Sequence, residues 1–458
     1  MNSFSTLSNL IRLAKMYLSD VNRLWNITEE QLKSYQDKQF RHIVNYAYTV
    51  PMYHEKYKKH GVHPTDIKGI DDISKLPFIT KEDLRKNYPY GIRPPNLDPE
   101  KSFIVSTSGS TGKPVFVIYD YFTTLKSLLA FARTLKAYGG SWRKSKVALI
   151  IDTEPGSAEN AFFIQSLPIL NRLFKIKNIQ YLNLAEKPEK IMKKLDEFQP
   201  EYIGSDPNML RQLAYLKEKG HGKQVDPIYL MSSGSMLDGY TKQYIEQVYG
   251  KRVFDAYGTT EGGPLSFECI EGDYHIHSDF VKIEFLDNND NPVPYNTIGH
   301  TVITKLYGAG TPIIRYTGID DIAIPIKKHP SCGITSEMIK TIQGRVSELI
   351  YLPNGKTLSP LALTGIPAKT MEYFDSYKIN QFQIVQHQLD DIEIKVVIDE
   401  QKDKHIPAEK IISELKKRFQ AKIGSDVTVT VTQYDKIRCE NNTQYSKVII
   451  SKLQNKES

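Results

Sequence analysis

Short apolar runs rich in β-branched residues alternate with longer segments of helical periodicity through the middle of the chain. Strands that alternate with helices in this way predict a parallel sheet covered by helices, an α/β fold. Ligands of such sheets bind beyond the carboxyl ends of the strands, where the turns fall. The predicted strands are 147–151, 179–184, 202–203, 228–231 and 252–254, and the clearest predicted helices are 160–174, 189–198, 207–219 and 240–249.

The pattern changes on both sides of this core. Residues 1–95 are polar and predict helices separated by turns. Residues 282–324 alternate short strand patterns with Asn, Asp, Pro and Gly turns, which indicates a β-rich subdomain. After a break near Gly344, the remaining pattern predicts a small α+β domain. Its strands are expected at 381–385, 392–398 and 427–431, and its amphipathic helix at 408–422.

The composition narrows the class of protein. A chain of 458 residues is long enough for two domains. Its 40% hydrophobic and 25% charged residues are typical of a soluble globular protein. The net charge of +7 suits a phosphate-bearing substrate but is too small for a nucleic-acid-binding surface of this size. We therefore expect no nucleic-acid partner.

Cysteine usage and hydropathy indicate a location. Three cysteines, Cys269, Cys332 and Cys439, argue against a disulfide framework and for a reducing compartment, the cytoplasm. No apolar run reaches the roughly 20 residues of a transmembrane helix. Arg12 and Lys15 interrupt the N-terminal apolar pattern, which excludes a secretory signal. Packing of this first helix on its own domain is favoured over attachment to a membrane surface.

A dense polar loop follows the apolar segment 103–105. Residues 106–114 contain five hydroxyl side chains, two glycines and Lys113. Glycines let a backbone approach a ligand closely, and hydroxyls and amides donate to phosphate oxygens. Thr107 stands where a Walker A motif needs glycine, and Pro114 replaces its Ser/Thr, so the loop is not that of a P-loop NTPase. The expected phosphate-binding residues are Ser106, Thr107, Ser108, Gly109, Ser110, Thr111, Gly112 and Lys113, with a plain polar turn as the alternative.

The loop resembles the phosphate loop of the AMP-forming adenylating enzymes, which include acyl-CoA synthetases, luciferases and peptide-synthetase adenylation domains. Three further motifs follow in the family's order. Residues 257–261 resemble its Tyr-Gly-x-Thr-Glu, residues 315–320 its arginine–tyrosine segment ending in an aspartate, and residues 344–348 its hinge Gly-Arg-x-x-Asp. The length and the N-terminal helices most resemble the phenylacetate–coenzyme A ligase branch. That branch also contains deazaflavin-adenylylating synthetases and proteins encoded with capsule genes.

The resemblance implies a division of the chain. It gives an N-terminal adenylation domain at 1–343, a hinge at 344–350 and a mobile C-terminal lid domain at 351–458. Within the first domain we expect a helical start at 1–95, an α/β core at 96–265 and a β-rich part at 266–343. Hinges are a few residues that absorb a large change in φ and ψ. Glu348 stands at the hinge position, where the family usually has aspartate.

The resemblance also assigns roles. Thr260 and Glu261 take the catalytic hydroxyl and the Mg²⁺ ligand, and a carboxylate suits this hard ion. Asp320 takes the ribose hydroxyls, since spacing from Arg315 favours it over Asp321. Lys447 takes the C-terminal catalytic lysine, although serine precedes it where the family has glycine, and Lys436 and a surface position are the alternatives. Further expected nucleotide contacts are Ser233, Gly234, Ser235, Ala256, Tyr257, Gly258, Thr259 and Arg345.

Cysteine and histidine gather in the β-rich part. Some members of this branch hold a structural zinc with a cysteine after the Thr-Glu motif, a nearby histidine and a Cys-x-Cys-Gly. This chain has Cys269, His275 and Cys332, but Pro330 replaces the first cysteine of the pair and His329 is the remaining candidate. Zinc and three unrelated side chains both stay open.

The function that the resemblance implies has two half-reactions. A carboxylic acid and ATP give an acyl-adenylate and pyrophosphate, and coenzyme A then displaces AMP. Transfer to an amine, a hydroxyl or a carrier protein, or a stop at adenylylation, are alternatives. A non-catalytic nucleotide-binding protein is the alternative from another class, and a homodimer stays open. The branch favours an aromatic acid, held by residues 202–206, 232–236 and 256–259.

Overall fold

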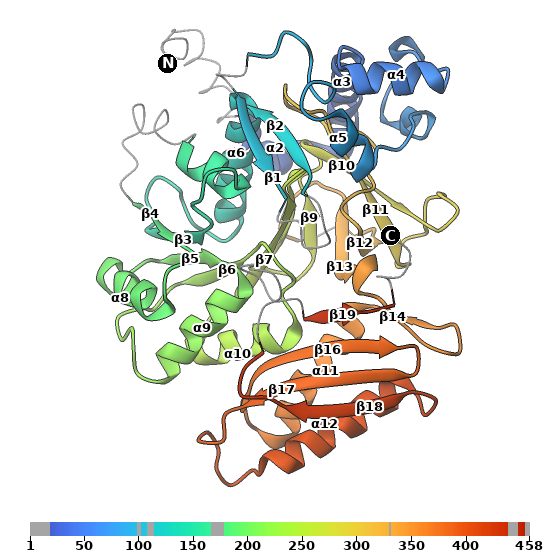
Figure 1. Ribbon diagram of the computed structural model, residues 1–458. Coiled ribbons are helices and arrows are strands. Elements are labelled where there is room, and N and C mark those ends of the chain that lie inside the picture. The colour runs from blue at the N-terminus through green and yellow to red at the C-terminus, as the bar shows by residue number, and fades with distance from the viewer. Residues whose placement is uncertain are drawn as a thin grey trace.

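The computed structural model describes residues 19–98, 102–107, 114–165, 178–328, 331–437 and 448–453. Within these residues, an 11-stranded sheet with the order β10-β11-β12-β13-β9-β8-β7-β6-β5-β3-β4 forms the centre of the molecule (Figure 1). The C-terminal residues form a separate four-stranded sheet in the order β18-β17-β16-β19, which lies beyond α9 and α10 at the bottom of Figure 1. The mixed α/β fold expected from the sequence is therefore confirmed.

One half of the large sheet is parallel. Apolar β-branched sequence produces it, and all five residues of β3 are buried. The helices α8, α9 and α10 connect or follow its strands, and Pro at the first turn of α8 and α9 starts two of them. The strands are β3 (Val147–Ile151), β4 (Ile179–Asn183), β5 (Tyr202–Ser205), β6 (Tyr229–Ser232) and β7 (Val253–Thr259), and the helices are α8 (Pro188–Phe198), α9 (Pro207–Glu218) and α10 (Gly239–Tyr249).

The predictions for this half agree with the structure to within a few residues. The predicted strand 147–151 coincides with β3. The helix predicted at 160–174 differs, since its described part is a π-helix, η4 (Asn160–Gln165), and residues 166–177 lie outside the described residues. π-Helical turns are often found at functional sites.

The sheet changes character at β7, which is parallel to β6 and antiparallel to β8. From there the strands run antiparallel, in agreement with the predicted β-rich part. They are β8 (Gly263–Glu268), β9 (Tyr274–Ile276), β10 (Val281–Leu286), β11 (Gly299–Lys305), β12 (Asp321–Ile326) and β13 (Met338–Arg345). A two-stranded hairpin of β1 (Ser102–Ser106) and β2 (Phe116–Asp120) lies apart from this sheet.

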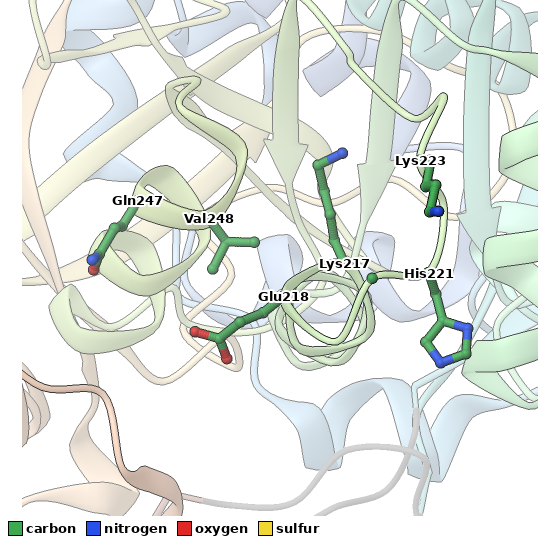
Figure 2. Close-up of a pocket in the computed structure, with 7 residues that line it drawn as sticks. Lys217, Glu218, His221, Lys223, Gln247 and Val248 are labelled. Atoms are coloured by element: carbon green, nitrogen blue, oxygen red, sulfur yellow. The ribbon is translucent and has the colours of Figure 1, made fainter. Parts of the chain in front are cut away.

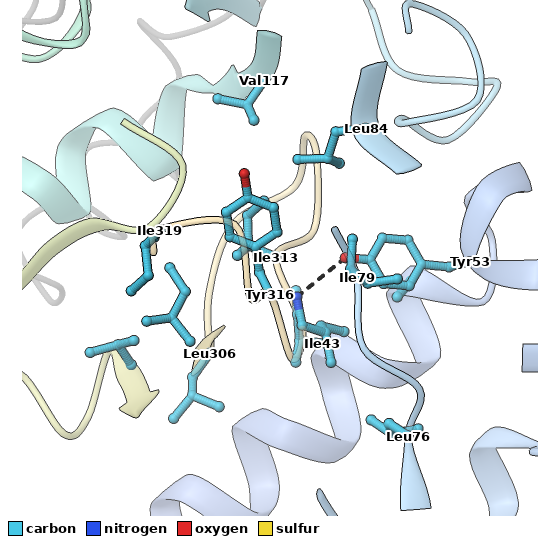
Figure 3. Close-up of a cluster of buried hydrophobic side chains, with 14 of the residues drawn as sticks. Ile43, Tyr53, Leu76, Ile79, Leu84, Val117, Leu306, Ile313, Tyr316 and Ile319 are labelled. Carbon is cyan, nitrogen blue, oxygen red and sulfur yellow. Dashed lines mark hydrogen bonds between the residues drawn. The ribbon is translucent and has the colours of Figure 1, made fainter. Parts of the chain in front are cut away.

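Helices of the N-terminal region pack on the antiparallel half. Thr28 with Gln31 and Thr80 with Asp83 form capping boxes that begin α3 and α5. Tyr53 joins this region to the sheet, since its hydroxyl donates to Pro312 O at 2.8 Å and accepts from Ile314 N at 3.2 Å (Figure 3). The helices are α2 (Arg23–Asn26), α3 (Glu29–Ala47), α4 (Pro51–Lys59), α5 (Lys81–Asn87) and α6 (Tyr121–Ala137), with 3₁₀ turns η1 (Pro64–Asp66) and η2 (Ile70–Lys75).

The C-terminal residues form a sheet packed on two helices, with a hydrophobic core that includes Leu363, Ile394 and Phe419. The sequence analysis predicted β16, β17, β18 and α12 but missed β14, β15, β19 and α11. The helix α11 contains Pro367 and is apolar on most of its surface. The elements are β14 (Ile350–Tyr351), β15 (Thr357–Leu358), β16 (Ile379–Gln388), β17 (Asp391–Ile398), β18 (Thr428–Gln433), β19 (Ile449–Ser451), α11 (Pro360–Phe374), α12 (Ala408–Ile423) and the 3₁₀ turn η5 (Val346–Glu348).

The C-terminal unit contacts α9 and α10 (Figure 1). Tyr240 donates its hydroxyl to Ile379 O at 2.5 Å, and Arg211 donates to the same carbonyl. Lys402 and Glu218 form an ion pair of 2.7 Å. Across the described ranges, no helix combines the length and the apolar character needed to span a membrane.

Candidate active site

A buried carboxylate lies in the turn between β7 and β8. The Glu261 side chain is 4% exposed, and the hydroxyl of Tyr316 donates to its Oε1 at 2.8 Å. Burial raises the pKa of Glu261, and the hydrogen bond from Tyr316 opposes that rise because it stabilises the charged form. Figure 3 shows Tyr316 among the apolar side chains that enclose it. The site thus holds a carboxylate in a low-dielectric environment.

The first two residues of the phosphate loop adjoin this turn through β2. Thr107 closes the base of the loop, since its Oγ1 accepts from Val115 N at 3.0 Å and its N–H donates to Val115 O at 3.0 Å. Tyr119, further along β2, donates its hydroxyl to the carbonyls of Thr260 and Glu261. Ser106 donates its N–H to Gly156 O at 3.1 Å. The remaining loop candidates, Ser108, Gly109, Ser110, Thr111, Gly112 and Lys113, lie outside the described residues.

Two neighbouring aspartates have different surroundings. Asp320 has a φ of +62° and accepts at Oδ2 from Ser347 N at 3.1 Å. Asp321 is buried and accepts at Oδ2 from the hydroxyl of Tyr257 at 2.5 Å, with Arg345 Nε 3.7 Å from its Oδ1. Burial raises the pKa of Asp321 to about 6, and Arg345 opposes the rise. The carboxylate of Asp321 is therefore engaged by two side chains, whereas that of Asp320 is half-buried and bonded to the backbone of the predicted hinge.

Arg315 has a structural role. Its guanidinium pairs with Glu284 at 3.0 Å and donates to Leu76 O at 2.7 Å. It also lies 4.0 Å from the centre of the Phe78 ring. These contacts hold the segment before α5 against the β-rich half. The side chain of Arg315 is therefore engaged in packing the fold.

The expected adenine segment follows β6. Ser233 and Gly234 are exposed, and Gly234 has a φ of +89° that favours glycine. Ser235 donates its hydroxyl to Asp206 Oδ2 at 2.5 Å. Because Asp206 follows β5, this bond joins the loops after two adjacent parallel strands. Such loops converge where ligands of an α/β sheet bind.

At the end of β7, the backbone of Gly258 lies close to that of Gly263 in β8. A Cβ at Gly258 would lie 3.0 Å from Gly263 O, which explains glycine there. Thr259 Oγ1 accepts from Gly262 N at 2.9 Å and so holds the turn. Ala256 pairs with Phe267 in the β7–β8 ladder. Thr260 is half-buried beside Glu261.

Three of the four zinc candidates come together. The ligand atoms of Cys269, His275 and Cys332 lie within 4.8 Å of one another, with Cys332 Sγ 3.2 Å from His275 Nε2. The other ring nitrogen of His275 lies 2.8 Å from Ser336 Oγ. Burial lowers the pKa of His275 to about 4, which keeps the ring neutral as a metal ligand must be. The donor set of sulfur and imidazole suits zinc; His329 lies outside the described residues.

Other site predictions fall in different places. Lys447 lies outside the described residues. Glu348 is half-buried in η5, one residue after Ser347, whose N–H binds Asp320. The sequence analysis missed Tyr119, because nothing local marks a tyrosine whose partner is 141 residues away.

A surface pocket of about 380 Å³ lies elsewhere (Figure 2). Two of its polar side chains are already paired: Lys217 donates to Val225 O at 2.7 Å, and Glu218 binds Lys402 at 2.7 Å and the Tyr244 hydroxyl at 3.0 Å. It sits at the carboxyl ends of α9 and α10, the opposite ends from the loops that converge beyond β5 and β6. We therefore do not assign the chemistry to it.

Comparison with known proteins agrees with this geometry. No family model matches the chain. Over 439 residues it is 25% identical to the phenylacetate-coenzyme A ligase of Thermus thermophilus, in an alignment that covers 89% of this chain and 93% of that protein. It is also 25% identical to protein CapK of Staphylococcus aureus, over 89% of this chain and 87% of that protein.

The chain is similar over most of its length to AMP-forming adenylating enzymes of the phenylacetate–coenzyme A ligase-like branch. A solved structure of a 2-hydroxyisobutyryl-CoA ligase in the postadenylation state, in complex with R3-HIB-AMP, has the same fold. The TM-score is 0.76 at 19% identity, and the alignment covers 95% of this chain and 92% of that one. The expectation of an adenylating-enzyme fold is confirmed.

Proposed function

We propose that this enzyme activates a carboxylic acid with ATP and transfers the acyl group to coenzyme A. The observation that carries the proposal is the buried Glu261–Tyr316 pair, joined by Tyr119 to the strand that follows the phosphate loop. The relatives named as phenylacetate-coenzyme A ligases support coenzyme A as acceptor and favour an aromatic acid. The reaction belongs in the cytoplasm, where ATP and coenzyme A are available.

In the first half-reaction a carboxylate oxygen attacks the α-phosphorus of ATP, the P–O bond to the β-phosphate breaks and pyrophosphate leaves. Holding the two reactants in line and supplying charge to the phosphates are the main contributions of the protein. Residues 106–113 hold the phosphates, Asp320 the ribose and residues 233–235 the adenine. Thr260 lies beside the reacting groups, and Lys447 bridges the carboxylate and the α-phosphate.

Glu261 fits a magnesium ion by its chemistry, since a carboxylate oxygen is a donor that this ion prefers. Its Oε1 is oriented by Tyr316 and its buried position excludes competing water. A magnesium ion held by Glu261 would supply positive charge to the ATP phosphates. The chain's own part is to keep Glu261 ionised, which the Tyr316 hydroxyl assists.

In the second half-reaction the thiolate of coenzyme A attacks the acyl carbonyl and AMP leaves. We place the change between the two at residues 344–350, where the carboxylate of Asp320 contacts Ser347 N. The lid comprises residues 351–458. Cys269, His275 and Cys332 would hold a structural zinc, with His329 as the candidate fourth donor, and so link the loop after β8 to the segment before β13.

A screen of acids by ATP–pyrophosphate exchange tests the proposal. AMP release is then measured with coenzyme A, other thiols and amines for each acid that supports exchange. We expect exchange with at least one aromatic acid and faster AMP release with coenzyme A than with an amine. AMP release that is stimulated by amines but not by coenzyme A would show that the acyl acceptor is an amine and would contradict the proposal.

A further inference from the structure

Lys305 is a buried lysine whose ammonium has no hydrogen-bond or ion-pair partner among the described residues. It ends β11, is 2% exposed and lies with Nζ 4.2 Å from the centre of the Tyr119 ring and 5.5 Å from that of Tyr307. Among the described residues, its ammonium makes no hydrogen bond and has no carboxylate within 4.0 Å. Burial lowers the pKa of Lys305 to about 7. Aromatic faces attract a cation only weakly compared with the water it has lost.

The nearest acidic residue does not pair with it. Asp120 raises the pKa of Lys305 through its charge, but its carboxylate caps α6. It accepts from Phe122 N at 3.2 Å, Thr123 N at 3.1 Å and Ala309 N at 3.0 Å. Those bonds fix the carboxylate at the helix end, so Asp120 cannot turn to Lys305 without breaking the cap.

A second buried polar group lies beside Lys305. The hydroxyl of Tyr307 has no hydrogen-bond partner within 3.5 Å in the described part of the chain. The hydroxyl of Ser127 is near enough to interact with it, but it donates its own hydrogen bond to Thr123 O. It lies against the turn that carries Glu261, because a Cβ at Gly263 would stand 3.0 Å from it and 3.6 Å from Ser127 Oγ. An unpaired buried polar group costs free energy, so each one in a native structure needs an explanation, such as a catalytic role or a bound water or ion.

The two groups adjoin the candidate active site through one side chain. The ring of Tyr119 lies under the ammonium of Lys305, while the hydroxyl of the same ring binds the carbonyl of Thr260. Phe162 from η4 stacks on Tyr119 with ring centres 5.6 Å apart. Aromatic faces and two unpaired donors therefore meet next to the residues placed at the reacting carboxylate.

We propose that Lys305 and Tyr307 form the polar end of the acyl site, and that the acid this enzyme activates carries a second oxygen acceptor away from its reacting carboxyl. This inference rests on the proposed function and names its substrate class. A carboxylate or a hydroxyl of the substrate accepts from the Lys305 ammonium and the Tyr307 hydroxyl. Tyr119 and Phe162 cover the apolar part. Glycine at 263 leaves room beside Tyr307.

Matched acids test the proposal by ATP–pyrophosphate exchange. Phenylacetate and 4-methylphenylacetate lack the second acceptor, 4-hydroxyphenylacetate has a neutral one and 4-carboxyphenylacetate a charged one; succinate and butyrate repeat the contrast for aliphatic acids. The variants are Lys305→Met and Tyr307→Phe. Tyr57→Phe is the control, because its buried hydroxyl also has no partner among the described residues and Tyr57 belongs to α4, which is not part of the proposed acyl site.

We expect the wild type to favour the acids with an acceptor in kcat/KM. Lys305→Met should lower that preference about 10- to 100-fold, the range for losing a charged hydrogen bond, while it leaves the plain acids unchanged. Tyr307→Phe should lower it less and Tyr57→Phe should not change it. Comparing the carboxylate-bearing acids with the hydroxyl-bearing acid shows which acceptor the site prefers. A preference that is equal in the wild type and in Lys305→Met would overturn the proposal.

Binding separates this inference from the proposed function. Acyl-sulfamoyl adenosines, which resemble the adenylate but do not react, are prepared with and without the second acceptor, and their Kd values are measured for the same variants. Absence of exchange with every acid would reject the proposed function, while the ratio of Kd values would still decide the role of Lys305. If Lys305→Met does not fold, the same ratio in Tyr307→Phe decides it.

Discussion

The hydroxyl of Tyr316 donates a hydrogen bond of 2.8 Å to Oε1 of Glu261, and both side chains are buried. Glu261 follows β7, and Tyr316 belongs to the segment before β12, 55 residues later. One bond thus joins two of the motifs by which the sequence resembles adenylating enzymes. It also opposes the tendency of burial to protonate the carboxylate.

Tyr316→Phe should move the acidic limb of the pH–rate profile to higher pH. The hydrogen bond favours the charged form of Glu261 and lowers its pKa, so its loss raises that pKa and leaves more of the carboxyl protonated at a given pH. The exchange rate near neutral pH should fall about 10-fold. The profile of pyrophosphate exchange from pH 5 to 9 is the measurement, with Tyr57→Phe as control. An unchanged acidic limb would show that Tyr316 does not affect the pKa of the group whose protonation limits the rate.

Asp320→Ala should raise the KM for ATP by about 10-fold or more, because it removes the carboxylate assigned to the ribose hydroxyls. Asp321→Asn is its matched comparison. Asp321 already binds Tyr257 and faces Arg345, so we expect that change to lower thermal stability while the KM for ATP stays within a few fold. Steady-state kinetics and thermal unfolding of both variants decide. The reverse pattern would move the ribose contact to Asp321.

The sequence predicts features that depend on neighbouring residues better than features that depend on contacts between distant segments. Periodicity located β3 to the residue because all its residues are apolar and buried. It missed α11, since Pro367 and an apolar surface on most sides hide the helical stripe. The family resemblance suggested a cluster of Cys269, His275 and Cys332, and the fold brings these three side chains together. Tyr119 and Lys305 gave no local signal, because their significance comes from contacts between distant segments.

Lys305→Met should stabilise the folded protein near neutral pH. The pKa of Lys305 is lowered to about 7 in the folded state, below the value of about 10.4 for an exposed lysine, so the unfolded chain binds more protons between these values. The destabilisation by Lys305 is therefore complete below pH 7 and is relieved as pH rises towards 10. The gain in Tm of Lys305→Met over the wild type should shrink between pH 6.5 and pH 9.5. A gain that is constant with pH would show that the lysine is not buried as a cation.

Metal analysis of the purified protein should find one zinc per chain. Cys269→Ser and Cys332→Ser should each remove it, because each deletes a thiolate donor. A drop in Tm on treatment with a chelator should accompany the loss and should be absent in the variants. If protein purified without chelators contains no stoichiometric zinc, the three side chains are neighbours without a bound metal and the zinc proposal is wrong.

Lys447→Ala should slow adenylation by about 10²- to 10³-fold, the scale for the loss of one donor to a transition state. Lys436→Ala is the matched comparison, since Lys436 is the other lysine considered for this role. Single-turnover formation of the acyl-adenylate measures the step directly. Exchange at the wild-type rate in Lys447→Ala would remove this residue from the mechanism.

The most direct test of the central claim is acid-dependent ATP–pyrophosphate exchange by the wild type, with Glu261→Gln as the matched variant. The account predicts exchange that requires an acid and magnesium together and that falls by about 10²-fold or more in Glu261→Gln. ATP binding without exchange for every acid tested, or exchange unchanged in Glu261→Gln, would contradict it.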